Sequence, residues 1–178
     1  MKFLTFKTKN DNEIRFGFKS YEKVIDIGLA AKWLYEKKND NSFINIPLTL
    51  HKALEKWDQN FRLLKALDSK LSDFNIESFS YKESDLTILP PIINPPAFRD
   101  FYAFEQHVKA ARKLRKLDMH PDWYKIPIFY FSNPNCCYGH GENIPYPNGT
   151  TELDFELEFA VIIGNGGSNI KSSEANKV

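Results

Sequence analysis

The stretch TELDFELEFAVIIG, residues 151–164, determines how the rest of the chain is interpreted. Side chains alternate between the two faces of a β-strand, so Asp154, Glu156 and Glu158 are expected on one face and the apolar residues on the other. Neighbours on one face lie about 7 Å apart, so their carboxylates repel one another unless a cation lies between them. Oxygen ligands suit Mg²⁺, Mn²⁺ or Ca²⁺. The alternation therefore predicts either a metal-binding strand or an ordinary strand with a solvated acidic face.

The apolar end of this stretch helps to decide between a metal-binding strand and a strand with a solvated acidic face. The run FAVIIG, residues 159–164, has no polar alternation and is typical of a strand that is buried on both faces. A strand buried in this way is a less natural place for a purely solvent-facing row of acids. The apolar run therefore favours the metal-binding interpretation.

The composition sets limits on the protein class. The 178 residues, of which 42% are hydrophobic, suit one ordinary domain or two small ones. The 24 basic and 23 acidic residues nearly cancel, and the sequence shows neither a signal peptide nor a membrane-spanning run. We therefore expect a globular cytoplasmic protein that binds neither nucleic acid nor membrane. The adjacent Cys136 and Cys137 fit neither a disulfide framework nor a zinc site and are expected to be reduced.

The order of patterns predicts an α+β fold in two domains. Aromatic alternation near the start predicts a hairpin or small sheet, and the helical spacing of residues 29–38 and 49–71 predicts helices that pack on it. The proline-rich run LTILPPIINPPAF, residues 86–98, forbids a regular helix. We place the domain boundary there, giving a small N-terminal α+β domain at 1–89 and a second, β-rich domain at 90–178.

Residues 99–118, RDFYAFEQHVKAARKLRKLD, are predicted to form an amphipathic helix. Asp100 and His107 are seven residues apart, which is two helical turns, so both side chains are expected on one side. Histidine suits proton transfer near neutral pH, although Asp100 also fits a helix N-cap and His107 also fits a structural role. The basic run at 109–116 is interpreted as a solvated helix face rather than a nucleic-acid patch.

Four segments together resemble the fumarylacetoacetate hydrolase family, and in particular its bacterial members. They are RDFYAFEQHV, PIFYFSNPN, GENIPYP and LDFELEFAVIIG, in this order, within residues 90–170. The resemblance implies that the second domain is an incomplete mixed β-sheet or β-roll of the type found at the C-terminus of this family.

The resemblance also implies roles for individual residues. Glu156 and Glu158 correspond to metal ligands, with Asp100 as a further ligand, and His107 corresponds to the general base. Tyr102 resembles a substrate-contacting tyrosine, and Asp154 is expected to make structural hydrogen bonds. The implied activity is hydrolysis of a carbon–carbon bond in a 1,3-dicarbonyl or acylpyruvate substrate, with a divalent cation, Mg²⁺, Mn²⁺ or Ca²⁺, as cofactor. The expected partner is a small-molecule 2-oxo or dicarbonyl acid.

Related members decarboxylate oxaloacetate or isomerise similar acids, so other reactions stay open. The decarboxylase branch places a glutamate three residues after its histidine, where this chain has Ala110, which favours hydrolysis. The family's catalytic domain also continues to a further metal-binding aspartate and a lysine beyond the acidic strand. We therefore expect a truncated chain with an incomplete site, or alternatively a non-catalytic remnant or interaction module. The full-length form is expected to be a homodimer.

Overall fold

The computed structural model describes the backbone of residues 1–178 and every side chain except that of Lys177. The contacts between residues divide the chain into two compact units. The first unit comprises Met1–Ile92 and Tyr138–Val178, and the second comprises Ile93–Cys137. Both contain strands and helices, so the predicted α+β class is confirmed. The predicted domain boundary between residues 89 and 90 stays a prediction.

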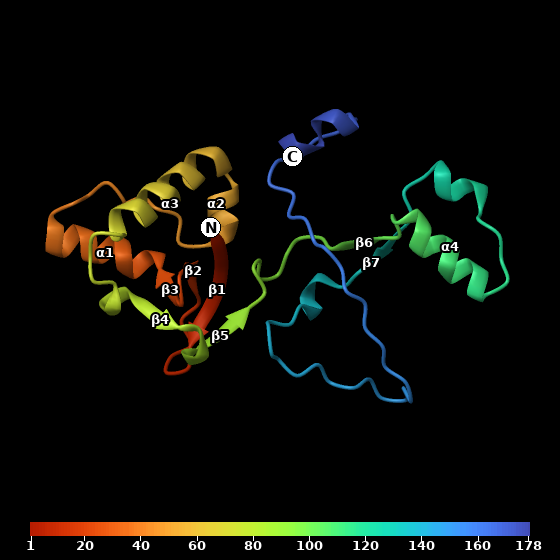
Figure 1. The fold of residues 1–178 in the computed structure, drawn as a ribbon, viewed down its shortest axis with the longest axis horizontal. Coiled ribbons are helices and arrows are strands. Elements are labelled where there is room, and N and C mark those ends of the chain that lie inside the picture. The colour runs from red at the N-terminus through yellow and green to blue at the C-terminus, as the bar shows by residue number, and fades with distance from the viewer. The chain divides into compact units, whose positions relative to one another are not determined.

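The first unit is built on an antiparallel sheet of five strands in the order β4-β3-β2-β1-β5 (Figure 1). In chain order the strands are β1 Lys2–Thr8, β2 Arg15–Ser20, β3 Lys23–Asp26, β4 Ser80–Lys82 and β5 Leu86–Leu89. The hairpin that was predicted from the aromatic alternation is confirmed, because β1 and β2 pair with Phe3 opposite Phe18. Gly17 on β2 is required by close packing, since a Cβ atom there would lie 2.2 Å from the carbonyl oxygen of Ile25 on β3.

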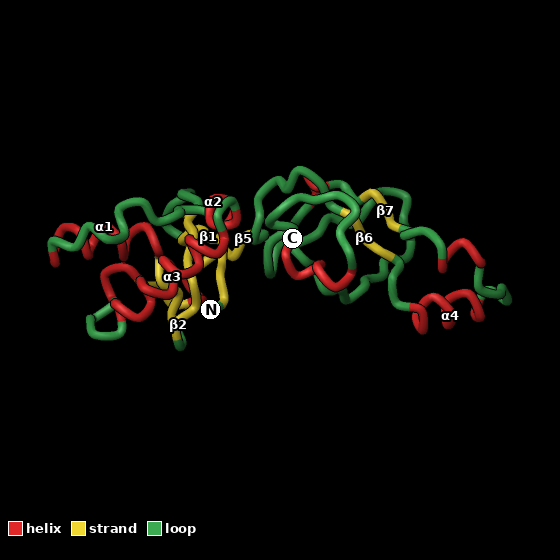
Figure 2. The backbone as a smooth tube through the Cα atoms, turned by 90° about the horizontal axis from the view of Figure 1, so that it is seen from above, coloured by secondary structure: helices red, strands yellow, loops and turns green.

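Three helices cover one face of this sheet (Figures 1 and 2). They are α1 Ile27–Lys38, α2 Leu50–Leu54 and α3 Trp57–Leu71. The apolar stripe of the sequence runs on from α2 into α3, but the helix is interrupted at Glu55 and Lys56. The Asn60 side-chain amide donates to the carbonyls of Lys52 and Ala53 at 3.2 and 3.0 Å. Asn60 therefore caps the end of α2 with a residue of α3.

The main core lies between the sheet and the helices. Its fully buried side chains come from β2, β3, α1 and α3 and from the 3₁₀ turn Glu77–Phe79; among them are Phe18, Ile25, Leu34, Leu64, Leu67 and Phe79. A smaller cluster of Phe6, Val24 and Leu86 lies on the other face of the sheet. Burial of apolar surface on both faces is the main driving force that holds these strands together.

One ion pair links the sheet to α1. Asp26 is 4% exposed and caps α1 by accepting from the Leu29 backbone N–H at 2.9 Å. Its other carboxylate oxygen accepts from Arg15 Nη1 at 3.0 Å. The charge of Asp26 is therefore compensated where it is buried, and the start of α1 is fixed on the sheet.

The second unit contains a two-stranded sheet and one helix. Strands β6 Arg99–Phe101 and β7 Phe129–Phe131 pair antiparallel, with Asp100 opposite Tyr130. Helix α4 spans Glu105–Leu114, and the 3₁₀ turns Pro121–Tyr124 and Pro134–Cys136 follow it. The prediction of a single helix from residue 99 is therefore wrong at its start. Residues 99–101 find a ladder partner in β7, and backbone pairing outweighs the helical spacing there.

The predicted strand at 151–164 is also wrong in this structure. These residues form neither a helix nor a strand, and Phe155, Leu157 and Phe159 are 86%, 93% and 97% exposed. A strand exists through its hydrogen bonds to a neighbour, and no strand within the described residues pairs with this segment. Alternation alone therefore did not make a strand.

The described helices also include none that is long and apolar enough to cross a membrane.

Candidate functional site

Asp100 and Tyr102 lie on or beside the first strand of the second unit. Asp100 is half-buried in β6, and the Tyr102 backbone N–H continues the ladder by donating to the Ile128 carbonyl at 3.1 Å. Residues two apart on an extended chain project to the same side. The backbone therefore presents the carboxylate of Asp100 and the ring of Tyr102 on one side of this small sheet.

His107 lies in the first turn of α4, and its side chain is exposed. Its imidazole meets the ring of Tyr102 nearly at right angles, with centroids 5.8 Å apart and an interplanar angle of 88°. Edge-to-face packing of this kind restrains both rings. The structure therefore brings together two of the residues that were singled out in the sequence, although they do not share a helix.

The start of α4 is held by side chains that the sequence analysis did not identify. No described side chain caps the helix at Phe104, but Glu105 accepts from the Tyr124 hydroxyl at 2.8 Å and pairs with Lys109 at 2.6 Å. Both contacts lower the pKa of the Glu105 carboxyl, and the hydrogen bond from Lys109 has the larger effect. The hydrogen bond from the Tyr124 hydroxyl to Glu105 raises the pKa of Tyr124. Glu105 is therefore held as an anion in the first helical turn, where the helix dipole favours negative charge.

Trp123 fixes the other side of the Tyr102–His107 pair. Its indole N–H donates to the Tyr102 carbonyl oxygen at 2.9 Å. Together with the bond from Tyr124 to Glu105, this contact ties the 3₁₀ turn Pro121–Tyr124 to two points of the segment 102–107, which carries Tyr102 and His107. The partners lie about twenty residues apart in the sequence, so no local spacing could have revealed them.

Glu156 and Glu158 lie in the first unit, within the segment that has no regular structure, and both are exposed. Asp154 in the same segment accepts from the N–H of Phe155 at 2.8 Å. Among the residues that the structure describes, no group of three or more His, Cys, Asp or Glu side chains is gathered in a way that could hold a metal ion. Of the predicted ligands, Asp100 thus belongs to the second unit, and Glu156 and Glu158 belong to the first.

The donor set itself fits a hard divalent cation. All three predicted ligands are carboxylates, and oxygen-only ligands are those that Mg²⁺, Mn²⁺ and Ca²⁺ prefer. Both cysteines are free and exposed, and the sulfur atom of Cys136 accepts from the Asn133 amide at 3.1 Å. The chemistry of the carboxylates is therefore suited to a metal site that these residues would form only when they are brought together.

Comparison with known proteins adds independent evidence. Residues 97–178 match the family model for the fumarylacetoacetate hydrolase C-terminal domain, and this range includes all five predicted site residues. The oxaloacetate tautomerase YisK of Bacillus subtilis (strain 168) is 27% identical over 166 residues, which cover 86% of this chain and 49% of that protein. The fumarylacetoacetase of Arabidopsis thaliana is 26% identical over 135 residues, or 65% of this chain and 32% of that protein. The chain therefore spans half or less of the length of these relatives.

Proposed function

Because residues 97–178 match the family model for the fumarylacetoacetate hydrolase C-terminal domain, we propose that the chain is a member of this family and supplies the proton-transfer and metal-binding residues of a metal-dependent hydrolase. The substrate class is a small acid with a 1,3-dicarbonyl or acylpyruvate group, and the bond that breaks is a carbon–carbon bond. The observation that carries the proposal is the contact between Tyr102 and His107 inside the matched region.

His107 is the proposed general base. Imidazole changes its protonation near neutral pH, and this ring is exposed at the start of α4, where a water molecule can reach it. The base takes a proton from water as the water oxygen attacks the carbonyl carbon. When the carbon–carbon bond breaks, the electron pair stays on the departing carbon, and the protonated imidazole can return the proton there. The contact with the ring of Tyr102 limits rotation of the imidazole, and the Tyr102 hydroxyl is suited to orient a carbonyl group of the substrate.

Asp100, Glu156 and Glu158 are the proposed metal ligands. A divalent cation bound there would polarise the carbonyl under attack and offset the negative charge that develops as the bond breaks. The three carboxylates would also set the position of the substrate, because a chelating dicarbonyl acid brings its own oxygen ligands.

A second reaction, tautomerisation of a 2-oxo acid, is favoured by one specific observation. The relative whose name is oxaloacetate tautomerase matches 86% of this chain. Tautomerisation moves a proton between carbon and oxygen and needs no water, so His107 would act as the proton carrier in both reactions. Decarboxylation has less support, since Ala110 stands where that branch of the family carries a glutamate.

The experiment uses the 178-residue chain with Mn²⁺ and follows both acylpyruvate cleavage and oxaloacetate tautomerisation. Turnover of either compound that is lost in His107→Ala and retained in the control His51→Gln, an exposed histidine of α2, supports the corresponding reaction. Mn²⁺ binding that is lost in Glu156→Gln, without either turnover, supports the non-catalytic interaction module instead. Absence of Mn²⁺ binding contradicts the proposed metal dependence.

A further inference from the structure

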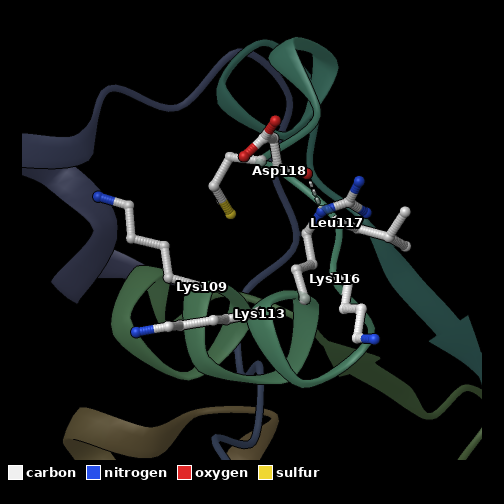
Figure 3. Close-up of a pocket in the computed structure, with 7 residues that line it drawn as sticks. Lys109, Lys113, Lys116, Leu117 and Asp118 are labelled. Atoms are coloured by element: carbon white, nitrogen blue, oxygen red, sulfur yellow. Dashed lines mark hydrogen bonds between the residues drawn. The ribbon is translucent and has the colours of Figure 1, made fainter.

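A second group of side chains in the unit Ile93–Cys137 has no part in the proposed function. A hollow of about 400 Å³ lies between the C-terminal half of α4 and the loop that follows it (Figure 3). Four cationic side chains, one carboxylate and two apolar side chains line it: Lys109, Arg112, Lys113, Lys116, Asp118, Leu117 and Met119. We call it the basic hollow. In Figure 3, Lys109 and Lys113 extend side by side from α4, and Asp118 lies on the loop across from them.

The positive charge of the basic hollow is only partly compensated. Lys109 is paired with Glu105 at 2.6 Å, and Arg112 uses its Nε–H to bind the carbonyl oxygen of Asp118. Lys113 and Lys116 have no acidic partner among the described residues. Several cations gathered on α4 and just beyond its end repel one another, and an anion among them relieves that repulsion.

The backbone at Lys116 has a conformation that is unfavourable for lysine. The N–H of Leu117 bonds to the Arg112 carbonyl at 3.0 Å and that of Lys116 to the Lys113 carbonyl at 2.9 Å, which is the Schellman ending of a helix. Lys116 occupies its left-handed position, with φ of 56°, where glycine is favoured and a side chain costs stability. A cation is thus held beside the basic hollow at a position where glycine would make a more stable helix end.

The basic hollow lies apart from the proposed reaction site. At 100° per residue, Lys109 and Lys113 project from the side of α4 roughly opposite to His107. An anion bound there does not contact the Tyr102–His107 pair directly, although it contacts the same helix. The basic hollow is therefore a separate site and not a subsite of the proposed reaction.

We propose that the basic hollow binds a small organic anion with at least two negative charges, of the phosphate-ester class. The volume suits a small ligand, the four cations match a multiply charged group, and Leu117 and Met119 provide contact for its organic part. A nucleic acid needs a longer basic surface, whereas these cations lie within residues 109–116 and the whole chain has a net charge of only +1.

The test titrates the full chain with inorganic pyrophosphate, citrate and a single-stranded oligonucleotide, followed by calorimetry and by amide NMR. We expect saturable pyrophosphate binding with shifts at residues 109–119. In Lys113→Glu the affinity should fall about tenfold, whereas the matched change Lys37→Glu on α1 should leave it unchanged. Citrate binding as tight as that of pyrophosphate would assign the site to carboxylates and overturn the phosphate class.

Lys116→Gly separates binding from folding. We expect this variant to melt at a higher temperature, because glycine suits the left-handed position, and yet to bind pyrophosphate more weakly. Binding that is unchanged in Lys116→Gly and in Lys113→Glu would overturn the proposal, as would equal weakening in Lys113→Glu and Lys37→Glu. Tighter binding of the oligonucleotide than of pyrophosphate, lost in Lys113→Glu, would overturn it in favour of a nucleic-acid surface.

Discussion

The sheet of the first unit and the segment 151–164 contain the same kind of sequence and differ in structure. Both alternate apolar and polar residues, but Phe18 in β2 is fully buried whereas Phe159 is 97% exposed. Strand β2 has paired neighbours on both sides, β1 and β3, and helices above it. The segment 151–164 has no paired neighbour within the described residues. The difference shows that a strand pattern becomes a strand only where backbone partners and an apolar surface are available.

The largest expected effect is a difference in stability between two phenylalanine substitutions, one in each of these regions. Phe18→Ala should lower the free energy of unfolding by about 3–5 kcal/mol, because it removes a fully buried ring and leaves a cavity. Phe159→Ala should change it by less than about 0.5 kcal/mol, because its ring contacts mainly solvent. Urea denaturation of both variants is the measurement. Equal losses in the two variants would mean that Phe159 is buried in solution.

A smaller loss of stability is expected when Gly17 is substituted. Gly17→Ala should cost about 1–3 kcal/mol, because the new methyl group would overlap the Ile25 carbonyl and the Phe6 ring. Among the described atoms, none lies within 4 Å of the position of a Cβ atom at Gly166, so Gly166→Ala is the matched control and should be nearly neutral. Thermal melting followed by circular dichroism compares the two. A neutral Gly17→Ala would contradict the close approach of β2 and β3.

In the second unit, the next smaller effect on stability is expected from a substitution of Trp123. Trp123→Phe keeps a large ring but removes the hydrogen bond to the Tyr102 carbonyl. The free energy of unfolding should fall by about 1 kcal/mol, which is the net contribution of a typical hydrogen bond. Because that bond supports the Tyr102–His107 contact, the ring protons of His107 should shift in the NMR spectrum. His51 lies in the other unit and serves as the internal control. A His107 spectrum identical to that of the parent chain would show that Trp123 does not position this pair.

The smallest expected effect is a change of thermal stability with pH. Lys19 donates to Glu83 at 2.6 Å, and this hydrogen bond is the main cause that lowers the pKa of Glu83 from its usual value. A carboxyl group with a lowered pKa stabilises the folded state at neutral pH, and this contribution is lost as the pH falls through the folded-state pKa. Glu83→Gln should therefore melt slightly earlier than the parent chain at pH 7, and the difference should disappear as the pH falls through the folded-state pKa of Glu83. A difference that persists in acid would exclude the ion pair as its cause.

Several features of the fold could be predicted from local sequence. Alternation in residues 2–20 gave the correct hairpin because both strands lie close together in the chain and pair with each other. Helical spacing around Val108, the buried residue of α4, identified that helix. Its start could not be predicted, because Arg99–Phe101 pair with β7 some thirty residues later.

The candidate site was predictable only in part. The sequence singled out Tyr102 and His107, and their rings are in contact. Trp123, Tyr124 and Glu105 support that contact through hydrogen bonds between distant positions, which composition and spacing do not encode. The carboxylates of 151–164 were identified by alternation, but alternation did not predict the structure of their segment, with which no described strand pairs.

The most direct test of the proposed metal site is paramagnetic broadening by Mn²⁺ in the NMR spectrum of the 178-residue chain. We expect low concentrations of Mn²⁺ to broaden the signals of Asp100, Glu156 and Glu158 together, and with them the ring signals of His107. The variant Glu156→Gln/Glu158→Gln should abolish this broadening, whereas Glu36→Gln on α1, an exposed glutamate, should preserve it. Broadening that spares Asp100 or His107, or that survives the double substitution, would contradict a site shared by these residues.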